Sequence, residues 1–248
     1  MIEGCRELLE LPRFTDLLAM VEEIADRSEY ARLRTVVREA ATAQSCVSDL
    51  AEAETCIIAL SELRGSVRGS GKMTKTATEA ALLRTAATLY ERATAAGAKR
   101  GERGSIQIRD RLTDCQREDH DAIVRLRQRS LAHVYVGEEL DGDIWHQDHL
   151  FLIEQGGPWI AAHASKRIQW HPSTFKRLQR QIPVALALVQ ERFHTKLGKM
   201  HRILETHPLP LALFEKHIFD PVERFGSEQK VQEILDGEVK GRTSFSDE

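Results

Sequence analysis

Apolar side chains recur through the first half of the chain at the three- and four-residue spacing of a helix face. After Thr15–Asp16, which has the composition of a helix cap, Leu17, Val21 and Ile24 follow this period. The pattern predicts one long helix from Thr15 past Val37 with a break near Ser28, and further helices from Ser48–Asp49 to Leu63, over 76–96, and from Thr113–Asp114 to about Tyr135.

The pattern changes in the second half of the chain. Two short runs rich in β-branched and aromatic residues flank Gly156–Gly157, which predicts a β-hairpin within about 143–170. Helical spacing returns after Pro172–Ser173, where we expect the serine to cap a helix that reaches about Glu205. Pro183 lies inside this segment and predicts a kink, because proline has no backbone N–H to donate.

Composition also favours a helical globular protein. The chain has 248 residues, of which 42% are hydrophobic, 29% charged and only 6% aromatic, so it can bury a sizeable core built mainly from helices. Two more short helices are predicted over 209–219 and 227–235. We therefore expect an all-α fold that forms a single domain over 1–239, with the hairpin inserted, followed by a polar tail over 240–248.

Charge and cysteine usage narrow the class of protein. A net charge of −3 gives no global electrostatic reason to bind nucleic acid, so any such binding has to come from a local patch. The cysteines lack CxxC spacing, and the first residues lack the order of a signal peptide, which is a basic segment followed by an apolar one. No run approaches the roughly 18 apolar residues of a membrane span. We expect a reduced, cytoplasmic protein with no membrane partner.

Histidines gather in and around the predicted hairpin, which raises the question of a metal site. The candidates are His146, His149, His163 and His171, with Asp143 and Asp148. On a strand, His146 and His149 would point to opposite faces because they are three residues apart. Polar surface histidines are therefore the favoured interpretation, and we expect neither a metal ion nor another cofactor.

Arginine dominates the charged residues from Lys99 to Arg129, where nine positive side chains meet six negative ones. The usual role of such a run is a solvated, salt-bridged surface. The alternative is a phosphate-binding strip, because the planar guanidinium group can hold a phosphate through two parallel hydrogen bonds.

The predicted fourth helix carries the stretch RLRQRSLAHVY, Arg125 to Tyr135. Arg127, the polar Gln128, and His133 two residues before Tyr135 resemble the signature of HEPN-type domains, in which four to six residues separate an arginine from a histidine. The resemblance covers about residues 76–136 and includes features of the abortive-infection and antitoxin-paired members. Gln128 is a departure, since active members typically have asparagine, aspartate or histidine at this position.

The resemblance implies a HEPN-like helical bundle that carries the motif on a late core helix, with the hairpin and the carboxy-terminal helices as additions. It implies a metal-independent endoribonuclease of a defence or toxin–antitoxin system, in which two protomers pair and cut RNA in a shared basic cleft. The implied catalytic residues are Arg127 and His133, and the implied RNA-binding residues are Arg125, Gln128, Arg129 and Tyr135. The implied partners are a second copy of the chain, RNA, and an antitoxin or nucleotidyltransferase.

Helix geometry qualifies this assignment. Six residues at about 100° each place Arg127 and His133 roughly 120° apart on an ideal α-helix, whereas Arg129 shares the face of His133. Convergence of Arg127 and His133 therefore needs a bent helix, long side-chain reach, or a partner protomer. Three other interpretations stay open: a catalytically silent HEPN-like module that binds nucleic acid or a partner protein, an all-helical interaction protein, and a core histidine at position 133.

Overall fold

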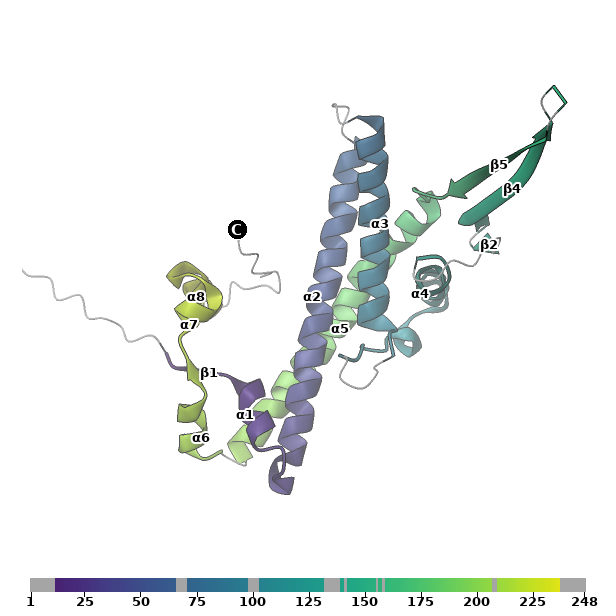
Figure 1. Ribbon diagram of the computed structural model, residues 1–248. Helices are drawn as coiled ribbons and strands as arrows, with labels where there is room; N and C mark the ends of the chain where they lie inside the picture. The colour runs from purple at the N-terminus through teal and green to yellow at the C-terminus, as the bar shows by residue number, and fades with distance from the viewer. Residues whose placement is uncertain are drawn as a thin grey trace, which may run out of the picture. The chain divides into compact units, whose positions relative to one another are not determined.

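The computed structural model describes residues 12–65, 71–97, 103–131, 139–140, 142–154, 156–157, 159–206 and 209–236 (Figure 1). Most of these residues are helical, which confirms the expected mainly α class. The helices are α1 (Leu17–Glu23), α2 (Ala31–Gly65), α3 (Lys72–Thr94), α4 (Asp114–Leu126), α5 (Pro172–Thr206), α6 (Leu211–Lys216), α7 (Pro221–Phe225) and α8 (Glu228–Leu235). Short turns of other helix types are η1 (Ser28–Tyr30), η2 (Arg109–Arg111) and the π-helical η3 (Arg127–Leu131).

Three antiparallel strand pairs complete the described structure. They are β1 (Phe14–Thr15) with β6 (Ile218–Phe219), β2 (Glu139–Leu140) with β3 (Asp143–Ile144), and β4 (His146–Glu154) with β5 (Trp159–Arg167). The β4–β5 pair is the predicted hairpin, and Gly156 and Gly157 in its turn both have positive φ, a conformation that glycine adopts without strain.

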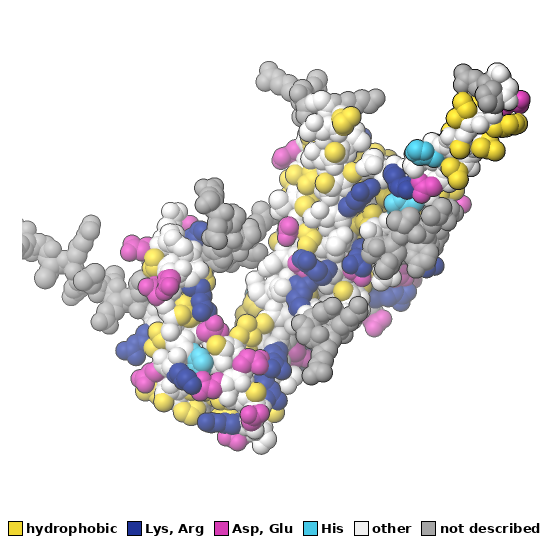
Figure 2. All heavy atoms as spheres, in the orientation of Figure 1, with side chains coloured by type: hydrophobic (Ala, Val, Ile, Leu, Met, Phe, Trp, Pro, Cys, Tyr) yellow, Lys and Arg dark blue, Asp and Glu magenta, His cyan; other side chains and the backbone are white. Residues whose placement is uncertain are grey.

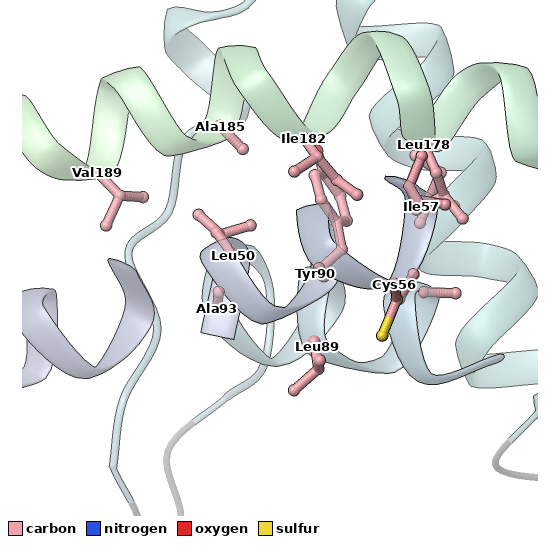
Figure 3. Packing of buried hydrophobic residues seen from close by; sticks show 14 of the residues in the cluster. Leu50, Cys56, Ile57, Leu89, Tyr90, Ala93, Leu178, Ile182, Ala185 and Val189 are labelled. Atoms are coloured by element: carbon pink, nitrogen blue, oxygen red, sulfur yellow. The ribbon is translucent and has the colours of Figure 1, made fainter. Parts of the chain in front are cut away.

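The chain divides into two compact units, residues 42–193 and residues 1–41 with 194–248. In the larger unit, apolar residues of α2, α3, α4 and α5 form one buried cluster. Tyr90 of α3 is fully buried and reaches toward Ile182 of α5, beside Leu50 of α2 (Figure 3). The extent of a single domain over 1–239 stays a prediction, and the polar tail over 240–248 lies outside the described residues.

The smaller unit has its own core. Met20 and Val21 of α1, and Ile24 directly after it, are buried with Leu33, Val37 and Leu209. Side chains cap the helices of this unit as their sequences suggest, since Asp16 accepts from the backbone of Ala19 and Ser227 accepts from that of Lys230. The β1–β6 pair and α7 belong to this unit and were not predicted, because each is too short to show a period. The helix predicted over 209–219 is wrong at its end, where Ile218–Phe219 forms β6.

The predicted boundary between the first long helix and the helix beginning at Ser48–Asp49 is wrong, because α2 is continuous from Ala31 to Gly65. The Ser48 hydroxyl donates to the carbonyl of Gln44 inside the helix and does not cap a new one. The Asp49 carboxylate instead pairs with Arg92 and Arg103. The predicted break near Ser28 is confirmed by the short turn η1 between α1 and α2.

The start of α5 also differs from its prediction. The helix begins at Pro172, and the residue that caps it is His171, not Ser173. The His171 Nδ1 atom accepts from the backbone N–H of Thr174 at 3.3 Å and lies 2.8 Å from the Thr174 hydroxyl. α5 then continues past Pro183 to Thr206. In the described part of the chain, none of the helices combines the length and the apolar composition that crossing a membrane requires.

Candidate functional site

The motif arginine lies at a change of helix type. Thr113 and Gln116 form a capping box that starts α4, and the helix runs to Leu126 before it widens into the π-helical turn η3, Arg127–Leu131. A π-helical turn bonds each N–H to the carbonyl five residues back, so it rotates the residues that follow relative to an ideal α-helix. Such turns are rare and are found frequently at functional sites.

Glu91 of α3 holds the first two residues of this turn. The Arg127 Nε atom lies 3.4 Å from Glu91 Oε2, and the Gln128 side-chain amide donates to Glu91 Oε1 at 3.4 Å. The Glu91 side chain is only 4% exposed, whereas that of Arg127 is 32% exposed. The buried carboxylate therefore partly offsets the charge of the guanidinium through an ion pair without a hydrogen bond at Oε2, while part of the arginine stays open to solvent.

The structure describes only two of the other four predicted site residues. Arg125 and Arg129 have exposed side chains. His133 and Tyr135 lie outside the described residues, so their predicted roles stay predictions. The structure therefore brings Arg127 and Gln128 together on one carboxylate and gives no placement of His133 relative to them.

A pocket of about 310 Å³ lies along α4 on the side of Arg125. Its polar lining includes Glu118, Asp121 and Arg125 of α4 with Thr174 and Arg177 of α5. Positive and negative side chains are mixed in this pocket, so it has no strong preference for an anion.

Asp119 joins α4 to α5 through buried charge. Its carboxylate accepts from Arg180 at 2.8 and 2.9 Å and from Arg177 at 3.2 Å, and the residue is 7% exposed. Both arginines keep contact with solvent. They therefore neutralise the buried carboxylate without losing all of their own hydration. This cluster fixes the helix that carries the motif against α5.

Most of the described arginines between Lys99 and Arg129 also form ion pairs with carboxylates. Ion pairs join Arg103 to Asp49, Arg109 to Asp121, Arg111 to Glu191, Arg117 to Asp114 and Arg127 to Glu91. These pairs correspond to the salt-bridged interpretation of the run more closely than to a continuous phosphate-binding strip.

Sequence reasoning missed His120, which the structure places in the core. His120 Nδ1 lies 2.8 Å from the hydroxyl of Tyr90, and both side chains are buried. Burial lowers the pKa of His120 and raises the pKa of Tyr90. The signal was present in the sequence, because His120 lies three residues before Ile123 and six before Leu126, on the buried stripe of α4.

The hairpin histidines do not gather around a common point. His146 donates through Nε2 to the carbonyl of Ser130 at 2.7 Å, which ties the start of β4 to the π-helical turn. His171 caps α5, and its Nε2 atom lies 3.2 Å from Asp143. Within the described ranges, no three His, Cys, Asp or Glu side chains come close enough together to hold a metal ion.

Comparison of the chain with protein-family models, with curated proteins and with solved structures found no match.

Proposed function

We propose that the protein is a HEPN-like, metal-independent endoribonuclease of a defence or toxin system, with a site that contains Arg127 and His133. The observation that supports this proposal most is the π-helical turn at Arg127–Leu131, whose first two side chains are held by the buried Glu91. A rare helix type and a buried carboxylate thus coincide with the arginine of the motif.

The chemistry needs a proton acceptor and a fixed positive charge. In this mechanism, His133 takes the proton of a ribose 2′-hydroxyl, and the resulting oxygen nucleophile attacks the adjacent phosphorus. Arg127 stabilises the negative charge that develops on the phosphorane-like transition state. The bond to the 5′-oxygen breaks and this oxygen takes up a proton, which leaves a 2′,3′-cyclic phosphate and a 5′-hydroxyl.

The remaining motif residues have supporting roles in this proposal. Glu91 keeps the guanidinium of Arg127 oriented, so less side-chain entropy is lost when the phosphate binds. Gln128, Arg125, Arg129 and Tyr135 contact the RNA. The protein acts as a homodimer, with two motif segments in one cleft, and its cellular partner is an antitoxin or a nucleotidyltransferase.

One observation favours a second candidate, a silent HEPN-like module that binds nucleic acid or a partner protein without cutting. The ion pair with Glu91 partly neutralises Arg127, which weakens its ability to stabilise a transition state. In this alternative, Arg127 has a structural role in joining η3 to α3.

RNA cleavage in EDTA separates the two candidates. The purified wild-type protein should cut single-stranded RNA with the chelator present, and His133→Ala should lower the rate by about 10²–10⁴-fold. Circular dichroism of the variant should match the wild type. Binding of varied RNAs without cleavage would establish the silent alternative, whereas loss of the folded spectrum in His133→Ala would assign His133 to the core.

A further inference from the structure

The β4–β5 hairpin exposes an unusual amount of apolar surface. The side chains concerned are Leu150, Phe151, Leu152, Ile153, Trp159 and Ile160, and Leu150 is 84% exposed. Figure 2 shows these hydrophobic side chains gathered along the outer half of the hairpin. Apolar patches of this kind on a folded protein mark sites of association.

Both faces of the hairpin are apolar, and no further strand pairs with either edge in the described structure. Leu150, Leu152 and Trp159 share one face, while Phe151, Ile153 and Ile160 share the other, as the register of the two strands requires. A two-stranded hairpin is marginally stable in water by itself, and three or more strands are normally needed. The hairpin therefore offers two apolar faces and two open strand edges to another polypeptide.

The chemistry of this surface excludes two classes of partner. From His149 to Ser165 the sequence contains no lysine or arginine, so the surface has no charge to attract nucleic acid. Open strand edges would leave backbone N–H and C=O groups unsatisfied inside a lipid bilayer. The remaining partner is a polypeptide that offers a free strand edge, and the same hairpin of a second copy offers one.

Strand β5 has the residue pattern that self-pairing requires. Its sequence, WIAAHASKR, is nearly symmetric in side-chain size about His163: two large residues, two small, the histidine, two small and two long. An antiparallel pair centred on His163 sets Trp159 of each copy opposite Arg167 of the other. The aromatic ring then meets a guanidinium group, and the stem of Lys166 covers Ile160.

The charges at the two ends of the hairpin agree with this arrangement. Glu154 lies opposite Trp159 at the tip, and Lys166 and Arg167 lie at the root. Antiparallel pairing brings the acidic tip of one copy toward the basic root of the other, and the two-fold axis repeats the contact. Arg167 keeps its 2.8 Å bond to Asp148, which holds its side chain in place and lowers the pKa of Asp148 to about 2.

We infer that two copies of this chain associate through their hairpins, with the β5 strands paired antiparallel about a two-fold axis at His163 to form a four-stranded sheet. This inference does not rest on RNA cleavage, because it concerns only the surface through which the copies meet. In this pairing the two hairpin roots, and the motif turns bonded to them through His146 and Ser130, lie at opposite ends of the sheet, so this contact is distinct from the shared cleft of the proposed function.

Two matched histidine variants test the axis. Light scattering of the full wild-type chain should give twice the 28.1 kDa chain mass. His163→Glu should give monomers, because two carboxylates would lie directly opposite each other across the axis. His149→Glu places the same charge on β4 of the same hairpin, away from the paired edge, and should remain dimeric. A monomeric wild-type protein, or equal dissociation of both variants, would overturn the inference.

Cross-linking gives an independent measurement of the register. With Cys5 and Cys115 replaced by serine, His163→Cys should form an intermolecular disulfide on mild oxidation, because residues directly opposite in an antiparallel pair have Cα atoms about 4.5–5.5 Å apart. His149→Cys should not cross-link. A dimer that persists in His163→Glu and fails to cross-link through His163→Cys would place the contact elsewhere. RNA cleavage by such a dimer would leave the proposed function standing.

Discussion

The hydroxyl of Tyr90 and Nδ1 of His120 lie 2.8 Å apart in the core of the larger unit, where they join α3 to α4. Burial lowers the pKa of the imidazole and raises that of the phenol, so both groups are neutral near pH 7. The pair is therefore a neutral hydrogen bond that holds α4, the helix that leads into the motif, against α3.

Acid should destabilise the larger unit through His120. In the unfolded chain, His120 takes up a proton as pH falls below its ordinary pKa of 6.5, whereas burial resists protonation in the folded chain. The contribution of neutral His120 is thus fully present above this pH and is lost as pH falls toward the lowered folded-state value. Urea unfolding from pH 7.5 to 5 should show this loss in the wild type and a smaller one in His120→Gln. Equal slopes for both proteins would show that other groups control acid stability.

Asp119 should contribute more to stability than its neighbour Asp121. Asp119→Asn removes a buried charge that accepts hydrogen bonds from two arginines, and we expect a loss of about 1–3 kcal/mol in the free energy of unfolding. Asp121→Asn is the control, since its pair with Arg109 is largely exposed and should contribute about 0–1 kcal/mol. Chemical denaturation of both variants at pH 7 measures the difference, and a larger loss in Asp121→Asn would contradict this account.

Cleavage rates should distinguish the two arginines of the motif. Arg127→Ala should slow single-turnover cleavage by about 10²–10³-fold, as expected for loss of a group that stabilises the transition state. Arg129→Ala should slow it less than tenfold. A larger effect of Arg129→Ala would show that Arg129, which shares a face with residue 133 on an ideal α-helix, is the arginine of the site. The assignment of Arg127 that the resemblance implies would then be wrong.

Glu91→Gln should release the charge of Arg127 while keeping the size of the buried side chain. If RNA phosphates contact Arg127, the variant should bind single-stranded RNA more tightly at low salt. The slope of log affinity against log salt should also steepen by up to about one. Fluorescence anisotropy over a salt series measures both quantities. An unchanged slope in Glu91→Gln, with the fold intact, would show that Arg127 does not face the RNA.

Local signals were sufficient for several elements of the fold. The apolar spacing that includes Leu50, Ile57 and Tyr90 predicted helices that bury one face, and the glycine pair at 156–157 predicted the position of the hairpin turn. Helix boundaries were harder to predict, because a serine inside a helix can bond back to the preceding turn, as Ser48 does, and has the same sequence signature as a cap. The histidine cap at His171 follows no common rule.

The site was less predictable because its partners are distant in sequence. Glu91 lies 37 residues before Gln128, so the motif alone gave no sign that a buried carboxylate would hold it. The widening of the helix at Arg127 was not predicted either, because apolar spacing over five residues does not distinguish a π-helical turn from an α-helix. His120 could have been placed in the core from its phase on α4, because it lies in register with Ile123 and Leu126.

The hydrogen bond from His146 to Ser130 links the hairpin to the motif turn. A ligand that shifts the π-helical turn has to break this hydrogen bond or move the first residue of β4 with the turn, and a contact that orders the hairpin favours the bonded position of the turn. Suppose that a ligand bound at the motif strengthens the contacts of the hairpin by some factor. Thermodynamic reciprocity then requires that those contacts strengthen binding of the ligand by the same factor.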